Sequence, residues 1–178
     1  MSADLIVITR NRPDVIAGCI ESVRSLTIGP EEVYVVDASD NDLTRQALEP
    51  YPEVNYLHLK NGKDRIPDSR NLGIRNTRSE ILGFLDDDSR PEPDWLQRIL
   101  ALHKDPKIGV VGGRIIEDGK PECAIDSRER GGDIGEDGHL SVNFNVHGDL
   151  PIDVLHVQGC NMTFKRSVFE DIGLFDPL

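Results

Sequence analysis

Residues 81–91 read ILGFLDDDSRP, so an apolar run leads directly into three consecutive carboxylates. The run is typical of a buried strand, and the acids after it place like charges together at one edge of a sheet. Such charges repel each other unless they are protonated, solvated or bridged by a cation. Asp86 and Asp88 are one residue apart, so both can reach one divalent ion if the backbone turns after the strand, while Asp87 points elsewhere. All-oxygen donors favour Mg²⁺ or Mn²⁺ over zinc.

Strand-like runs alternate with helical patterns along most of the chain. The runs cover residues 5–9, 33–36, 54–59, 81–85 and 108–111. Apolar residues recur at helical spacing over residues 15–26 behind Pro13, further helices are expected over 70–77, 93–102 and 165–172, and regular structure is also expected over 152–157. Trp95 in the third helix is expected to pack in the core. The alternation predicts an α/β domain with a mostly parallel sheet.

Composition narrows the function classes. The 178 residues carry a net charge of −12, which disfavours binding to nucleic acid or to an anionic membrane, because both need a surplus of Lys and Arg. Three scattered cysteines, Cys19, Cys123 and Cys160, suit a reducing compartment, and each is expected to be a small buried residue. Neither a signal peptide nor a transmembrane segment is expected from the sequence. We therefore expect a cytoplasmic protein.

One segment departs from the alternation of strands and helices. Residues 117–150 are rich in Gly, Asp and Glu and contain few large apolar residues. An irregular segment of this length is usually a functional lid or is disordered. We expect a single domain over residues 1–178 that carries this segment as an irregular insert.

Polar side chains follow three of the expected strands. Thr9 and Asn11 follow the first strand, Asp37 and Ser39 the second, and residues 86–88 the fourth. Ligands of an open parallel sheet bind outside the carboxyl ends of its strands. An acid after the second strand can accept hydrogen bonds from a ribose or a base, and a helix amino terminus after the first strand favours phosphate oxygens. Together the groups predict a nucleotide site with a metal, whereas singly they could be turns, helix caps or an acidic loop.

Five short motifs occur in the order and spacing of a known family. They are ITRNR (8–12), VVDAS (35–39), SRNLGI (69–74), FLDDD (84–88) and GCNMTF (159–164). The chain resembles the family 2 glycosyltransferases, and the resemblance extends from Asp4 to Pro177. It implies the GT-A fold of the nucleotide-diphospho-sugar transferases, a Rossmann-like three-layer α/β/α sandwich. It also implies transfer of a sugar from a nucleoside-diphosphate donor, with a UDP-sugar favoured, to an acceptor hydroxyl with inversion at the anomeric carbon.

The resemblance also implies roles for individual residues. The expected donor-binding residues are Thr9, Asn11, Asp37, Ser39, Arg70, Asp86 and Asp87. Among them Thr9 and Asp37 would hold the base and the ribose, and Arg70 would contact the nucleotide. The acceptor is a saccharide, a lipid-linked saccharide or a protein, and the sequence does not separate these three.

Two carboxylates carry the expected chemistry. Asp86 would face the ribose or the donor sugar, and Asp88 would bind the Mn²⁺ or Mg²⁺ that bridges the diphosphate and neutralises charge on the leaving group. Gly159 and Asn161 would line the sugar and acceptor cavity, although a buried structural amide is an open alternative for Asn161.

One expected part of the family pattern is missing. The general base of the family follows a Gly-x-Phe-Asp segment, which here is residues 173–176, and the chain ends at Leu178. We therefore expect a truncated chain that lacks the segment with the base. Residues 135–137 read Gly-Glu-Asp like the missing motif, but they precede Gly159 and no helical pattern follows them. Arg10 stands where the family often has an aromatic or small residue, and it adds charge near the base pocket.

Three other functions compete with this interpretation. A haloacid-dehalogenase-like phosphatase also has an Asp-x-Asp motif, but on its first strand, and Arg90 stands where that family would have Thr or Val. A sugar-nucleotide pyrophosphorylase would have a Gly-rich basic loop near its amino terminus, which this chain lacks. A noncatalytic nucleotide-sugar-binding domain stays open because the base is missing.

Overall fold

The computed structural model describes residues 1–60, 66–117, 123–124, 131–141, 144–147 and 150–177. Its elements in chain order are β1 (Ala3–Thr9), α1 (Pro13–Arg24), β2 (Glu32–Asp37), α2 (Leu43–Ala47), β3 (Val54–His58), α3 (Ile66–Asn76), β4 (Ile81–Asp86), α4 (Trp95–His103), β5 (Val110–Gly112), β6 (Cys123–Ala124), β7 (Val146–His147), β8 (Asn161–Lys165) and α5 (Arg166–Ile172). Among the described helices none has the length and hydropathy needed to cross a bilayer.

The main sheet has six strands in the order β3-β2-β1-β4-β8-β5. The first four are parallel, whereas β8 runs antiparallel to both β4 and β5. The chain moves outward from β1 to β3 and then crosses to the other side of β1, so the strand order reverses between β1 and β4. A crevice outside the carboxyl ends of these strands is the position at which open α/β sheets bind ligands. The expected mostly parallel sheet is confirmed.

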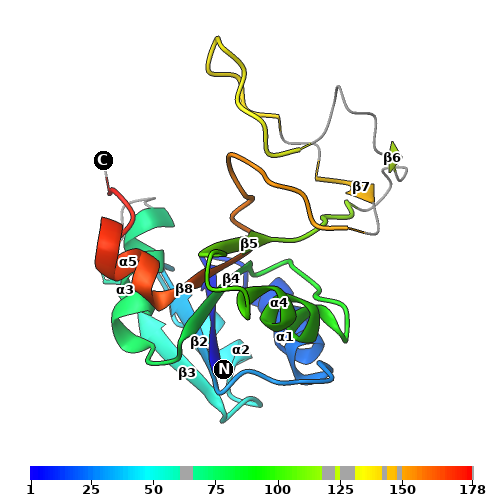
Figure 1. Ribbon diagram of the computed structural model, residues 1–178. Coiled ribbons are helices and arrows are strands. Elements are labelled where there is room, and N and C mark those ends of the chain that lie inside the picture. The colour runs from blue at the N-terminus through cyan, green and yellow to red at the C-terminus, as the bar shows by residue number, and fades with distance from the viewer. Residues whose placement is uncertain (61–65, 118–122, 125–130, 142–143, 148–149, 178) are drawn as a thin grey trace.

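Helices cover both faces of the sheet, as Figure 1 shows. Side chains alternate between the two faces along β1: Leu5 and Val7 pack in one core cluster with residues of α1 and α4, and Ile6 packs in another with Ile74 of α3. All three β1 side chains are fully buried. The molecule is therefore the expected three-layer α/β/α sandwich.

Three features of the fold differ from the sequence-based expectations. The short helix α2 was not expected, because five residues are too few for a periodic pattern. Strand β8 lies where the expectations named a motif without a strand. The expectation of regular structure over residues 152–157 is wrong. These residues contain no helix or strand, and Ile152, Val154 and Leu155 are exposed.

The irregular insert, residues 117–150, contains little regular structure in its described part. It holds the two-residue strands β6 and β7, which pair in parallel, and one isolated bridge between Ile134 and Leu140. Residues 135–138 form a turn closed by the Gly138 N–H on the Gly135 carbonyl, with Gly138 at φ +81°. The Gly-Glu-Asp triplet is therefore part of a turn and not of a helix.

The cysteines differ in burial. Cys19 of α1 is fully buried, and burial raises the pKa of its thiol to about 12, so it is an inert core residue as expected. Cys160 is only half-buried, beside the end of β4, which differs from the expectation. The side chain of Cys123 lies outside the described residues.

Candidate functional site

The ends of β1 and β2 are joined by one hydrogen-bond network. Thr9 and Asp37 are register neighbours. Asp37 is fully buried and accepts hydrogen bonds from the Ser39 N–H at 2.8 Å, from the Ser39 hydroxyl, and from the Tyr56 hydroxyl at 2.8 Å. The Ser39 Oγ in turn accepts the Asn11 N–H at 2.7 Å. This network fixes Asn11 at φ +53° and so shapes the loop that begins α1.

The chain turns sharply at the end of β4, where the Ser89 N–H donates to the Asp86 carbonyl at 3.0 Å. Asp87 points inward and is buried, and its Oδ2 accepts the Thr9 hydroxyl at 2.7 Å. Asp86 is half-buried and Asp88 is exposed. Asp87 therefore points inward as expected of the middle acid, but its carboxylate and that of Asp88 both bind the guanidinium of Arg12.

Two arginines hold this turn in place. Arg12 donates from Nη1 to Asp87 at 2.6 Å and from Nη2 to Asp88 at 2.9 Å, and both carboxylates raise the pKa of its guanidinium. Arg90 donates to the carbonyls of Asp87 and Ser89 and also to the Val15 carbonyl in α1. The β4 turn is thus attached to α1 from two directions.

Three charged groups at this edge of the sheet keep unbonded donor or acceptor atoms among the described residues. Asp86 makes no side-chain hydrogen bond or ion pair with the described residues, and burial raises the pKa of its carboxyl against the opposing effect of Arg70. Arg70 is half-buried and lies 5.6 Å over the Phe175 ring; its Nε has no hydrogen-bond partner in the described part, and burial lowers the pKa of its guanidinium. Only one oxygen of Asp88 is bonded, to Arg12. Of these three groups only Arg70 has a buried atom without a partner in the described part, and such atoms are rare in proteins.

The return of the chain through residues 159–161 forms the other wall. A Cβ at Gly159 would lie against the tip of the Arg70 side chain, so a larger residue there would displace the guanidinium. The Asn161 side chain accepts the Trp95 Nε1–H at 2.9 Å and donates to the Arg114 carbonyl at 3.0 Å. Asn161 therefore joins α4 to the start of the insert, which favours the structural alternative for this amide. Trp95 packs in the core as expected.

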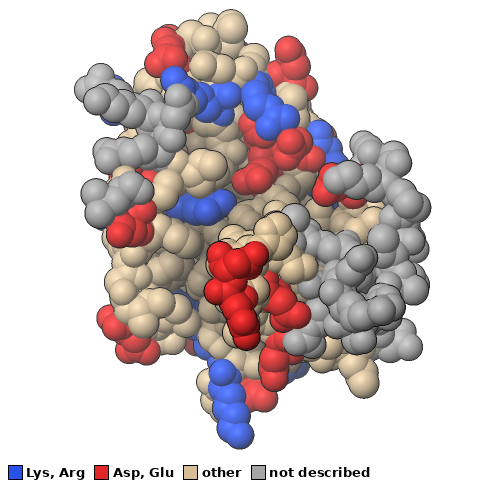
Figure 2. Space-filling view, turned by 90° about the horizontal axis from the view of Figure 1, so that it is seen from above, with Lys and Arg blue, Asp and Glu red and all other residues tan. Residues whose placement is uncertain are grey.

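Charges of both signs lie on the face seen in Figure 2, where Lys and Arg are interspersed among Asp and Glu. A local basic group can therefore hold an anionic ligand despite the net charge of −12.

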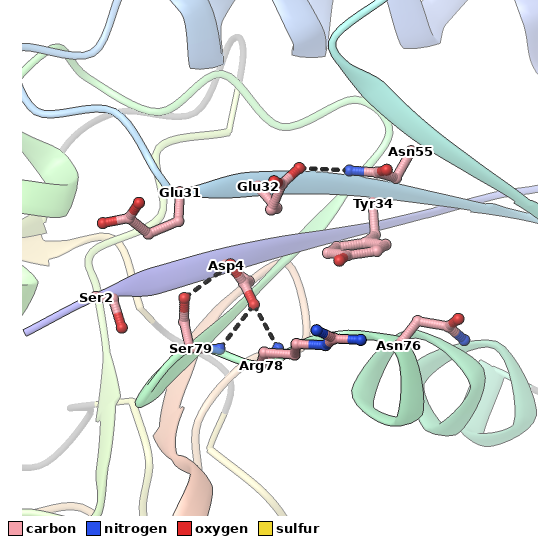
Figure 3. A pocket seen from close by; sticks show the side chains of 9 residues that line it. All are labelled: Ser2, Asp4, Glu31, Glu32, Tyr34, Asn55, Asn76, Arg78 and Ser79. Atoms are coloured by element: carbon pink, nitrogen blue, oxygen red, sulfur yellow. Dashed lines mark hydrogen bonds between the residues drawn. The ribbon is translucent and has the colours of Figure 1, made fainter.

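A polar cavity lies at the opposite edge of the sheet, at the amino ends of its strands, and measures about 580 Å³. Figure 3 shows Asp4 in its wall, where the carboxylate accepts the backbone N–H groups of Arg78 and Ser79 and the Ser79 hydroxyl at 2.8 to 2.9 Å. Asp4 is 2% exposed and fully hydrogen-bonded. This acid therefore stabilises the chain ahead of β4 and leaves no unpaired carboxylate for a ligand.

The donor set of Asp86 and Asp88 is compatible with a hard divalent cation. Asp86 and Asp88 offer carboxylate oxygens, the donors that Mg²⁺ and Mn²⁺ prefer. No group of three or more possible metal-ligating side chains occurs in the described residues. A magnesium site that uses one or two carboxylates takes its other ligands from water and substrate phosphates.

The structure brings the expected site residues together from distant parts of the chain. Thr9, Asp37 and Ser39 are buried and hydrogen-bonded, Asn11 and Asp88 are exposed, and Asp86 and Arg70 are half-buried. Sequence reasoning missed Arg12, Arg90 and Tyr56 as their partners. One signal was available for Arg12: three adjacent acids need a nearby cation, and an arginine precedes the helix start that faces them.

The amino-acid sequence of this chain is similar to those of several other proteins. The chain is 28% identical over 171 residues to glucosyl-dolichyl phosphate glucuronosyltransferase from Haloferax volcanii, a match that covers 88% of this chain and 50% of that protein. It is 28% identical over 117 residues to hyaluronan synthase from Pasteurella multocida, which covers 62% of this chain and 12% of the synthase. The chain thus spans half or less of the length of these relatives.

Structure comparison identifies the fold. The structure of S. aureus TarS 1–349 superimposes with a TM-score of 0.70 at 17% identity, covering 96% of this chain and 49% of that 1–349 chain. The mannosyltransferase PcManGT from Pyrobaculum calidifontis, in complex with GDP-Man and Mn²⁺, superimposes with a TM-score of 0.68 at 20% identity, covering 98% and 47%. The fold is therefore the expected GT-A fold. The model of glycosyl transferase family 2 matches residues 4–173, and the chain belongs to this family.

Proposed function

We propose that this chain binds a nucleoside-diphosphate sugar at the carboxyl ends of β1, β2 and β4 and supplies the donor site of a metal-assisted, inverting glycosyltransferase. The observation that carries the proposal is the set of three charged groups that keep unbonded atoms among the described residues: both carboxylate oxygens of Asp86, one of Asp88 and the Nε of Arg70. Two carboxylates beside one guanidinium match the charges of a metal ion and a diphosphate. TarS has been solved with UDP-GlcNAc and PcManGT with GDP-Man and Mn²⁺, which supports a sugar nucleotide as ligand.

Each group has a proposed task. Thr9, Asn11, Asp37 and Ser39 form the wall that receives the base and the ribose, with a UDP-sugar as the favoured donor. Arg70 holds the diphosphate, because a guanidinium matches phosphate oxygens in shape and charge. Asp88 binds Mn²⁺ or Mg²⁺, and Asp86 lies toward the ribose or the sugar. Once bound, the metal neutralises charge on the departing diphosphate.

The sugar and acceptor side of the site is proposed at Gly159 and Asn161. Because Gly159 has no side chain, it does not fill the space beside the Arg70 guanidinium, and this space is left for a ligand. Asn161 would contact the sugar or acceptor only by exchanging its bonds to Trp95 or Arg114. We assign the general base, which removes the proton of the acceptor hydroxyl, to no residue of this chain.

Calorimetric titration with UDP, GDP and dTDP, each with and without Mn²⁺, tests the donor site. We expect UDP to bind, and to bind at least tenfold more tightly with Mn²⁺. Absence of binding for all three nucleotides, or equal affinity without metal, would contradict the proposal. Phosphate release from a generic phosphate ester would favour the phosphatase, and turnover of a bound sugar nucleotide separates a transferase from a noncatalytic binding domain.

A further inference from the structure

Arg12 holds an unusual position at the junction of the two loops that form the crevice. It is the residue before Pro13, the first residue of α1, and its own side chain does not cap the helix. The backbone on its amino side is fixed, because the Asn11 N–H is bound to Ser39 and Asn11 has a left-handed conformation. The Arg12 side chain therefore starts from a fixed backbone, and its guanidinium reaches the β4 turn.

The two arms of Arg12 are bound unequally. The arm on Asp87 measures 2.6 Å, and the Asp87 side chain is 4% exposed, with its other oxygen occupied by Thr9. The arm on Asp88 measures 2.9 Å, and both partners are about half exposed, at 46% and 54%. An ion pair between exposed groups contributes little free energy, whereas a buried carboxylate needs its partner. The Asp88 arm is therefore the one that a competitor can displace.

Resting on the proposed function, we propose that Arg12 is a tethered cation that occupies Asp88 until a divalent metal ion replaces it, while its other arm stays on Asp87. The guanidinium stabilises the same carboxylate that the metal needs, so the two cations compete for Asp88. Competition weakens metal binding by the empty site and favours entry of metal together with the diphosphate, whose negative charge offsets the nearby Arg12.

The test measures Mn²⁺ binding to the protein without nucleotide, by the loss of the free Mn²⁺ EPR signal at constant ionic strength. Arg12→Lys is the main variant, because one ammonium can keep the buried Asp87 paired but cannot form the two-armed contact. Arg12→Gln removes the charge as well. Arg98→Gln is the matched control: it removes one positive charge from an exposed ion pair with Asp94 on α4.

We expect Mn²⁺ to bind about threefold more tightly to Arg12→Lys and to Arg12→Gln than to the wild type, the size expected for loss of an exposed ion pair. Arg98→Gln should bind as the wild type does. Unchanged or weaker Mn²⁺ binding by Arg12→Lys, in a variant that melts like the wild type, would overturn the inference. Wild-type protein that binds UDP only with Mn²⁺ keeps the proposed function in either case, whereas wild-type protein that binds neither would refute that function itself.

Discussion

At the amino ends of β1 and β4 a buried acid, Asp4, accepts hydrogen bonds from two backbone N–H groups and one hydroxyl. At the carboxyl ends of the same two strands Asp86 has no bonded partner in the described part of the chain, and Asp88 has one that is exposed to solvent. The amino edge also has the exposed Glu31 and Glu32, but its buried acid is fully bonded, whereas the half-buried acid of the carboxyl edge, Asp86, is not. A fully bonded acid stabilises the fold, and an open one is available to a ligand.

Asp87 shows that the difference lies in bonding and not in position. It belongs to the carboxyl edge, between two acids that are open, yet it is buried and bonded on both oxygens, to Thr9 and Arg12. In its contacts it resembles Asp4 more than its neighbours. The comparison therefore predicts that Asp4 and Asp87 support stability and that Asp88 supports binding.

The largest expected effect is at the amino edge. Asp4→Ala leaves the N–H groups of Arg78 and Ser79 without their acceptor, so we expect the free energy of unfolding to fall by about 3 kcal/mol in urea titration. Glu32→Ala is the control, since Glu32 lines the same cavity but is exposed and bonds only Asn55, and it should cost less than about 0.5 kcal/mol. A similar loss for both variants would remove the distinction between bonded and open acids.

Thr9→Val, at the carboxyl edge of the sheet, should have the next largest effect on the free energy of unfolding. The valine keeps the shape of the side chain but removes the hydroxyl that donates to the buried Asp87, and a hydrogen bond to a charged group contributes about 2 kcal/mol. Thr9→Ser keeps the hydroxyl and should lose less than half as much in the same urea titration. Equal losses would show that the methyl group, and not the hydrogen bond, stabilises this position.

The parallel part of the fold and the strand-end acids were predictable because they depend on local patterns. Apolar runs bounded by turns locate β1, β2, β3 and β4, and the order of helices between them implies a parallel sheet with polar groups at one edge. Asp37, Asp86 and Asp88 follow from the ends of those runs. Thr9 pairs with Asp37 in register and Ile8 with Asp86, so these strand ends lie side by side at one edge of the sheet.

The parts of the fold and of the site that were not predicted depend on contacts between residues far apart in the sequence. Arg12 and Asp87 are 75 positions apart, and no local pattern pairs them. Strand β8 enters between β4 and β5 only after the whole insert, so its neighbours are set by tertiary packing of Phe164 and Met162 and not by its own periodicity. Residues 152–157 have the composition of a strand but no strand beside them in the described part, and an extended segment without a partner does not form a sheet.

Asp88→Ala separates binding from stability at the carboxyl edge. Asp88 is exposed, so the free energy of unfolding should change by less than about 0.5 kcal/mol. Under the proposed function the Mn²⁺-dependent affinity for UDP should fall at least tenfold, as measured by calorimetry. Asp94→Ala removes an exposed acid of the Arg98 ion pair and should leave the UDP affinity unchanged. Undiminished Mn²⁺-dependent binding by Asp88→Ala would exclude its metal role.

The smallest expected effect tests whether the loss of stability at low pH comes from the acids at the two edges of the sheet. His103 of α4 is fully buried away from both of them, its Nε2 lies 2.8 Å from the Thr163 hydroxyl of β8, and burial lowers its pKa. The unfolded chain takes up a proton near pH 6.5 while the folded chain resists it, so stability is lost as the pH falls below that value. Between pH 7.5 and 5.5 the wild type should lose on the order of 1 kcal/mol more than His103→Gln, which cannot titrate. Because the acids of both edges are the same in the two proteins, their titration cancels in the difference. Parallel urea-unfolding stabilities across this range would show that the acid response comes from the edges and not from the helix layer.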